Sequence, residues 1–220
     1  MFNAPFVAIA LTASIPILYW VQTRVAAIDP IVIQLLAFQP SGLILGGWWP
    51  GVVTSMFLHA GWAHALFNMT GALAFAPPVA RAMKGAKGAA GFLLFYMACG
   101  VLAALGYAVL HLNQEGWLVG ASGAVFGLIG AALRLLRVKE GRLRRLTDRR
   151  FLVPAAVLMV VNAATGLTGL LPGASGLQVA WEAHAAGFVA GALLIGPWLK
   201  IFGVRPTAFD STTDLRDPSI

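Results

Sequence analysis

The amino-acid sequence predicts an all-α membrane protein in which six transmembrane helices form one bundle and both termini lie in the cytoplasm. Three observations support this. Of the 220 residues, 59% are hydrophobic and only 10% are charged, whereas soluble domains carry about 25% charged residues. The mean hydropathy is +0.82. Lysine and arginine gather in every second connection between the apolar stretches.

Six apolar stretches are close to the length of a membrane span, about 20 residues for a hydrocarbon core of about 30 Å. We expect spans at 5–22, 60–79, 90–111, 120–136, 151–170 and 182–199. The first has no basic segment before it and is long for a signal peptide, which favours a retained span. Residues 1–202 are therefore expected to form one membrane domain, followed by a polar, disordered cytoplasmic tail at 203–220.

The basic residues set the expected orientation. Of the 15 Lys and Arg residues, 14 lie at the end of the second, fourth or sixth span or after it, and Arg24 is the exception. Because positive residues are retained in the cytoplasm, these three connections are placed on that side. The basic run between 134 and 150 is thus interpreted as a topology determinant. Contact with anionic membrane lipids is a modest addition, and nucleic acid is not an expected partner.

Polar residues recur at one depth in three of the predicted spans. Ser122 lies twelve residues before Arg134, which is roughly 18 Å along a helix. His184 lies sixteen residues before Lys200, roughly 24 Å. His64 lies seventeen residues before Arg81, about 25 Å, and so at a similar level. One such histidine could equally serve an interhelical hydrogen bond. Several polar residues at one depth favour a functional site, because ionisable groups are costly inside a membrane.

A serine and a histidine at one level favour acyl-transfer chemistry. Ser122 would be the nucleophile and His184 the base that removes its proton. Two pairs of small residues would let the helices approach closely: Gly123 with Gly127, and Gly187 with Gly191. Generic helix packing explains the glycines but not the Ser and His beside them.

An acidic third member is hard to find. Glu182 is two residues from His184, which turns it about 200° away on a helix. Asp29 and Glu115 lie in predicted outer loops. The sequence therefore predicts a Ser–His dyad.

Donors for a developing oxyanion are available from the second span. His64 and Asn68 are four residues apart and share a helix face. The backbone N–H of Ser122, at a helix start, could donate as well. His59 precedes the second span and is expected to brace the loop.

Other classes of function fit less well. The four histidines have no acidic or cysteine ligand beside them, so no metal or other cofactor is expected. A transporter is disfavoured by the interior, which is poor in charges, and by the lack of broken helices in matched halves. A structural membrane protein would not require the pairing of Ser122 with His184.

Three blocks of residues resemble the rhomboid intramembrane serine proteases. They are His59 to Asn68, the tetrapeptide Gly120 to Gly123, and Ala183 to Gly191, in the family's order on spans two, four and six. The resemblance covers about 45–200. It implies Ser122 as nucleophile, His184 as base, and His64 and Asn68 as oxyanion-stabilising side chains. It also implies cleavage of transmembrane protein substrates near their outer end, without a metal or nucleotide.

The sequence departs from the family pattern at Phe126, where many bacterial members have a Tyr that stacks on the catalytic histidine. Phe keeps the ring, so we expect the stacking to survive. The resemblance further implies a minimal six-span member in a bacterial inner membrane, with its site open to the periplasm. The alternative within the fold is a non-proteolytic rhomboid-like protein that binds membrane proteins. Such members typically lose the Ser or the His, and both stand here.

Overall fold

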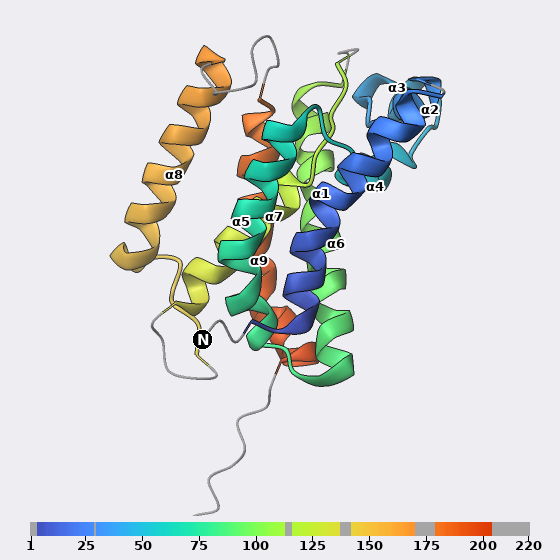
Figure 1. Ribbon diagram of the computed structural model, residues 1–220. Helices are drawn as coiled ribbons and strands as arrows, with labels where there is room; N and C mark the ends of the chain where they lie inside the picture. Colours follow the sequence, from blue (N-terminus) through green and yellow to red (C-terminus); the bar gives the residue numbers. More distant parts are fainter. Residues whose placement is uncertain (1–3, 29, 113–115, 137–141, 170–178, 204–220) are drawn as a thin grey trace, which may run out of the picture.

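The computed structural model describes residues 4–28, 30–112, 116–136, 142–169 and 179–203, and within these ranges the secondary structure is helical. A single bridge between Phe38 and Leu118 is the one strand-like pairing there. Six long helices form the body (Figure 1): α1 (Phe6–Ala26), α5 (Trp62–Arg81), α6 (Gly85–Leu110), α7 (Ser122–Leu135), α8 (Arg149–Thr168) and α9 (Trp181–Phe202). Short helices fill the connection before α5: α2 (Pro30–Leu36), α3 (Pro40–Leu45), α4 (Gly51–Thr54) and the 3₁₀ turn η1 (Ser55–Phe57).

The six long helices coincide with the six predicted spans to within a few residues at most ends. Four of them, α1, α6, α8 and α9, are long and apolar enough to cross a membrane by length and composition. The helix α7 is apolar but has only 14 residues, about 21 Å of rise. The all-helical bundle is therefore confirmed, while the count of six spans and the side on which the termini lie stay predictions. Beyond Gly203, the predicted tail lies outside the described residues.

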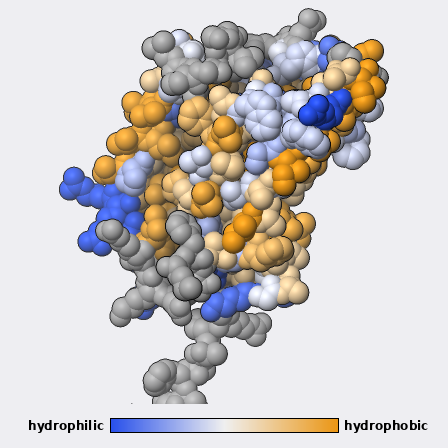
Figure 2. Space-filling model, in the orientation of Figure 1, coloured by the Kyte–Doolittle hydropathy of each residue, from blue (hydrophilic) through white to orange (hydrophobic). Residues whose placement is uncertain are grey.

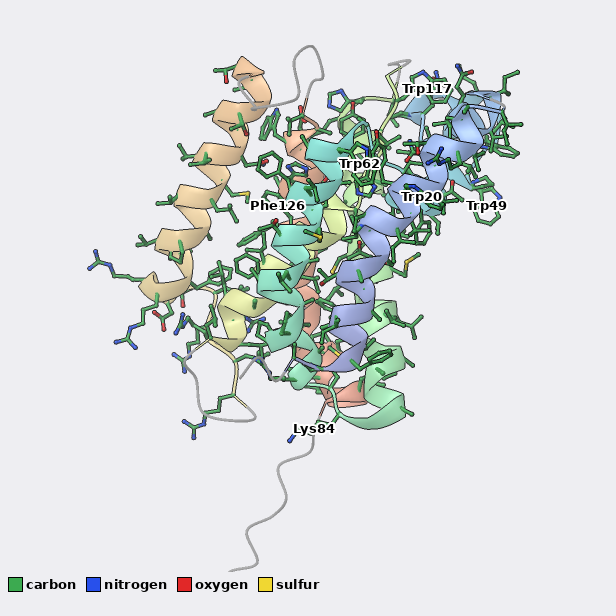
Figure 3. All side chains as sticks on the ribbon, in the orientation of Figure 1. Trp20, Trp49, Trp62, Lys84, Trp117 and Phe126 are labelled. Carbon is green, nitrogen blue, oxygen red and sulfur yellow. The ribbon has the colours of Figure 1, made fainter. Side chains whose placement is uncertain are left out.

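The surface has the character of a membrane protein. Large apolar side chains are exposed along α8, among them Val157, Val160 and Leu167. Apolar patches of this extent mark contact with a membrane or a partner. Figure 2 shows hydrophobic residues over the middle of one face and hydrophilic residues nearer its ends. Four tryptophans lie toward the end of the molecule opposite Lys84 (Figure 3): Trp20, Trp49, Trp62 and Trp117.

The centre of the bundle is α7, most of whose residues are buried. It packs on α9 through glycines with almost no space between the two backbones. A Cβ on Gly187 would collide with the carbonyl oxygen of Gly123, and a Cβ on Gly191 would collide with that of Gly127. Small residues at these positions are what allow the approach. The start of α7 is thereby fixed against the start of α9.

The helix α8 is attached differently. It stands along one side of the bundle (Figure 1), and only Phe151, Ala155 and Asn162 are buried on it. Near its first turn Phe151 packs on Phe188 of α9, with ring centroids 6.0 Å apart. In its second half Asn162 reaches α9, as described below.

Candidate active site

The site is built around the Cα atom of Gly120. A Cβ added there would lie 2.7 Å from Cε1 and 2.8 Å from Nε2 of His64, and 3.5 Å from Oγ of Ser122. The backbone of Gly120 has φ +127°, a conformation that residues with a Cβ rarely adopt. Glycine is thus required for two reasons, and its lack of a side chain lets the imidazole of His64 and the hydroxyl of Ser122 share one space.

Backbone contacts hold the segment that leads into α7. The N–H of Gly120 donates to the carbonyl of Ser55 at 2.9 Å, and Phe38 and Leu118 exchange two backbone hydrogen bonds. Ser122 is then the first residue of α7. Its N–H is among those that have no partner within the helix, and it lies at the positive end of the helix dipole. The position therefore offers a hydroxyl and a backbone donor together.

His184 lies in the first turn of α9 and faces the start of α7. Its ring stacks on Phe126 with centroids 4.3 Å apart and an interplanar angle of 9°. Phe126 and Ser122 are four residues apart and so lie on one face of α7. The carbonyl oxygen of Ala183 is 3.7 Å from the position of a Cβ on Gly123. The structure thus packs the first turn of α9, which carries His184, against the first turns of α7, which carry Ser122 and Phe126. Figure 3 shows Phe126 on the side of the bundle toward α8.

One contact of His184 comes from a residue that is not among the predicted site residues. Nδ1 of its ring lies 2.7 Å from Oδ1 of Asn162 on α8. The amide nitrogen of Asn162 donates to the carbonyl of Trp181 at 2.8 Å. Asn162 is a polar residue within an apolar stretch, the same signal that drew attention to His64, so that signal could have found it.

His64 is arranged as a hydrogen-bond donor. The N–H of Ala60 donates to its Nδ1 at 3.3 Å. In neutral imidazole only one nitrogen carries the proton, so in His64 the proton resides on Nε2, which lies 2.8 Å from the position of a Cβ on Gly120. The imidazole of His64 also lies within electrostatic reach of His184. It can therefore present an N–H to a group bound at Ser122.

Asn68 lies one turn further along α5 and is buried. Its amide nitrogen donates to the carbonyl of His64 at 3.0 Å, and its second N–H remains for another acceptor. His59 also lies close by, with its ring centroid 5.2 Å from that of His64. The structure thus gathers Asn68 and His59 around His64, which shares the space at Gly120 with the Ser122 hydroxyl.

Two hydrogen bonds fix the loop that carries His59. Its backbone N–H donates to Oε1 of Gln22 on α1, and its carbonyl accepts from Nε2 of Gln22, both at 2.8 Å. The imidazole is only 2% exposed. Burial, with repulsion from His64, lowers the pKa of His59 to about 4. His59 is therefore neutral near pH 7.

The acidic candidates lie elsewhere. Oε1 of Glu182 is 3.3 Å from Nε2 of His111, at the end of α6, so its carboxylate is directed to that histidine. Asp29 and Glu115 fall outside the described residues. Within the described part of the chain, no group of three or more His, Cys, Asp or Glu side chains is placed to hold a metal ion.

Comparisons with known proteins identify the family of the chain. A family model described as the rhomboid domain matches residues 46–200. YdcA of Bacillus subtilis (strain 168), whose name marks it as a candidate rhomboid protease, is 41% identical over 93 residues, 42% of this chain and 43% of that protein. The chloroplastic rhomboid-like protein 11 of Arabidopsis thaliana is 33% identical over 154 residues, 69% of this chain and 52% of that protein.

The rhomboid protease GluP of Bacillus subtilis (strain 168) is 35% identical over 101 residues, 45% of this chain and 18% of that protein. The chain thus matches about half or less of the length of each relative. The family model nevertheless covers more than half of this chain, and the apolar helices agree with an integral membrane protein. The chain belongs to the rhomboid family.

Proposed function

We propose that this protein is an intramembrane serine endopeptidase that cleaves transmembrane protein substrates near their outer end. Ser122 would act as nucleophile and His184 as its base. The observation that carries the proposal is the convergence at Gly120. There the Ser122 hydroxyl and the His64 imidazole share one space, and His184 is held beside them by Phe126 and Asn162.

The proposed reaction begins when Nε2 of His184 removes the proton from Oγ of Ser122. The oxygen attacks the carbonyl carbon of the scissile bond, and the carbonyl oxygen becomes an oxyanion. His184 then gives the proton to the leaving amine. Water repeats the sequence on the acyl-enzyme and releases the second product, which restores Ser122.

The oxyanion would be stabilised by donors that are already in place. Nε2–H of His64 and the backbone N–H of Ser122 lie on the side where the negative charge develops. The free N–H of Asn68 would add a third donor. Each such donor would contribute on the order of 10² to 10³ in kcat.

The membrane setting follows from the same proposal. We place the protein in a bacterial inner membrane with six spans, both termini in the cytoplasm and the site open to the periplasm. The short α7, about 21 Å long, would start inside the hydrocarbon core if its last turn lies at the cytoplasmic boundary. Ser122 would then lie on the order of 10 Å below the outer boundary of a core of about 30 Å.

The test is cleavage of a reconstituted transmembrane peptide, with products mapped by mass. The parent protein should cut the peptide near its outer end. Ser122→Ala and His184→Ala should each produce no cleavage above background. Cleavage by either variant at the parental rate would refute the dyad. An intact peptide with every variant, parent included, would favour the non-proteolytic binding protein.

A further inference from the structure

Asn162 is unusual for its helix. Its side chain is 4% exposed, while the adjacent Val160 and Val161 are 68% and 54% exposed. Among the described residues of α8, it is the one buried polar side chain. Buried amides require hydrogen-bond partners, and Asn162 finds both of them on α9.

The orientation of the amide is determined by the Trp181 carbonyl. A carbonyl oxygen only accepts hydrogen bonds, so the nitrogen of the Asn162 amide must face it. This contact is 2.8 Å long. The oxygen of the amide then faces Nδ1 of His184 at 2.7 Å. Because that oxygen only accepts, Nδ1 must carry the proton, and the lone pair of the ring lies on Nε2.

We infer that Asn162 is a positioning residue that holds His184 in the tautomer whose Nε2 can take the proton of Ser122. This inference rests on the proposed function. Phe126 fixes the plane of the His184 ring by stacking, and Asn162 fixes the rotation of the ring within that plane. The amide thus occupies the place that a carboxylate holds in a Ser-His-Asp triad.

In soluble enzymes with a Ser-His-Asp triad, an asparagine in place of the aspartate lowers activity. Replacing the Asp by Asn there lowers kcat by about 10⁴, because the imidazole is held in the wrong tautomer. Here the Trp181 carbonyl takes the N–H of Asn162 and leaves only the oxygen for His184. The pairing of Asn162 with the Trp181 carbonyl is what makes a neutral amide suitable as the third member.

Among the described residues, none of those placed against His184 carries a charge that would replace this effect. From α5, His64 interacts with it electrostatically and is neutral in the arrangement described above. From α7 it meets the ring of Phe126, beside Ser122. Glu182, on its own helix, is directed to His111 on α6. The protonation of His184 should therefore respond strongly to a charge placed at position 162.

The test compares three variants of the full chain in proteoliposomes: Asn162→Asp, Asn162→Leu and the control Val161→Ala on the exposed side of α8. The readouts are kcat and KM for a transmembrane peptide, the pH profile of kcat and the thermal unfolding midpoint. Asn162→Leu removes the acceptor, so kcat should fall on the order of 10² with KM within a factor of two. Val161→Ala should match the parent.

Asn162→Asp tests the role through the pH profile of kcat, which would not change if Asn162 only stabilised the fold. The carboxylate still accepts from Nδ1 and also favours the imidazolium form of His184. The acidic limb of the kcat profile should therefore move to higher pH by about one to three units, with activity retained above it. An unmoved limb, or an Asn162→Leu variant with parental kcat, would overturn the inference.

The two levels of the proposal fail in distinguishable ways. A parent protein that cleaves nothing contradicts the proposed function itself. A parent that cleaves through Ser122, with an Asn162→Asp variant whose pH profile overlays the parental one, contradicts only the role of Asn162. If Asn162→Leu fails to fold, the position of the acidic limb in the kcat profile of Asn162→Asp still tests the role of Asn162.

Discussion

Two of the helices that pack on α9, α7 and α8, contact it in opposite ways. On one side α7 meets α9 with backbone against backbone, at Gly123 with Gly187 and at Gly127 with Gly191. On the other side α8 buries few side chains and reaches the start of α9 through the amide of Asn162. The helices that carry the proposed nucleophile and the proposed base are thus held rigidly together, while the partner of Nδ1 comes from the least packed helix. Alignment of the site depends on both.

The largest effect is expected from a substitution in the glycine contact between α7 and α9. Gly191→Val would place a branched side chain against the carbonyl of Gly127, which belongs to a helix backbone and cannot rotate away. Overpacking costs about 1–3 kcal/mol even where side chains can adjust, so we expect the folded protein and its activity to be lost. The measurements are the unfolding midpoint in detergent and cleavage of the peptide.

The matched control is Gly42→Ala, where the new Cβ would meet Gln39 at 3.8 Å, an ordinary contact. That variant should unfold and cleave as the parent does. A Gly191→Val protein with the parental midpoint would show that α7 and α9 are not in backbone contact.

The next effect concerns the start of α7. Gly120→Ala would bring a methyl group against the His64 ring and would force alanine to adopt φ +127°. Displacing His64 removes one oxyanion donor, so kcat should fall by about 10² to 10³ while the bundle stays folded. Kinetics with the transmembrane peptide measure this. Gly61→Ala, where a Cβ meets nothing within 4 Å, should retain most of the activity, and equal losses in both variants would contradict the geometry at Gly120.

A third prediction concerns pH and the loop bound to α1. The pKa of His59 is about 4 in the folded protein and 6.5 without its surroundings. Between these values the unfolded chain holds more protons, so stability is complete above pH 6.5 and declines as the pH falls toward 4. The difference between the two pKa values limits the contribution of His59 to the free energy of unfolding to about 3 kcal/mol.

The measurement is the unfolding free energy at pH 7 and at pH 4.5. His59→Gln removes the titrating ring and should flatten the dependence over this range. An equally steep dependence in the variant would assign it to other groups.

The smallest effect is expected at Phe126, and it compares the two contacts that hold His184, the ring of Phe126 and the amide of Asn162. Phe126→Ala removes the stacked ring, which contributes about 0.5–1.5 kcal/mol in aromatic pairs, so kcat should fall about threefold to tenfold. The loss should be smaller than in Asn162→Leu, because Asn162 still fixes the tautomer. Phe126→Tyr keeps the ring and should stay near the parent. A larger loss in Phe126→Ala than in Asn162→Leu would reverse the ranking of the two supports.

Much of the fold could be predicted because hydrophobic length alone locates the long helices. Their ends were less predictable. α7 starts at Ser122 and not at 120, because the positive φ of Gly120 and the turn at Ala121 precede the helix. α6 starts at Gly85, earlier than the predicted residue 90, since small residues before Phe92 continue the helix although they are weakly apolar.

The site could be predicted in part for a similar reason. Ser122, His184 and His64 lie at comparable depths, and depth follows from counting residues along helices. Asn162 could have been noticed as a polar residue in an apolar stretch, but its contact with His184 could not be predicted, because that contact depends on how α8 is rotated about its axis. Exposed valines surround Asn162, so hydropathy does not indicate which face of α8 meets α9. Likewise, Glu182 is paired with His111 at the end of α6. The residues around Glu182 in the sequence do not indicate that α6 lies next to it.

The central claim is that Ser122 is a nucleophile activated by His184, and covalent labelling tests it most directly. The parent protein, in proteoliposomes, is treated with a fluorophosphonate, and the modified residue is identified by mass. The account predicts an adduct on Ser122 that His184→Ala abolishes and Val161→Ala leaves unchanged. A preparation that cleaves the peptide but carries no adduct on Ser122, or labels equally well without His184, would contradict it.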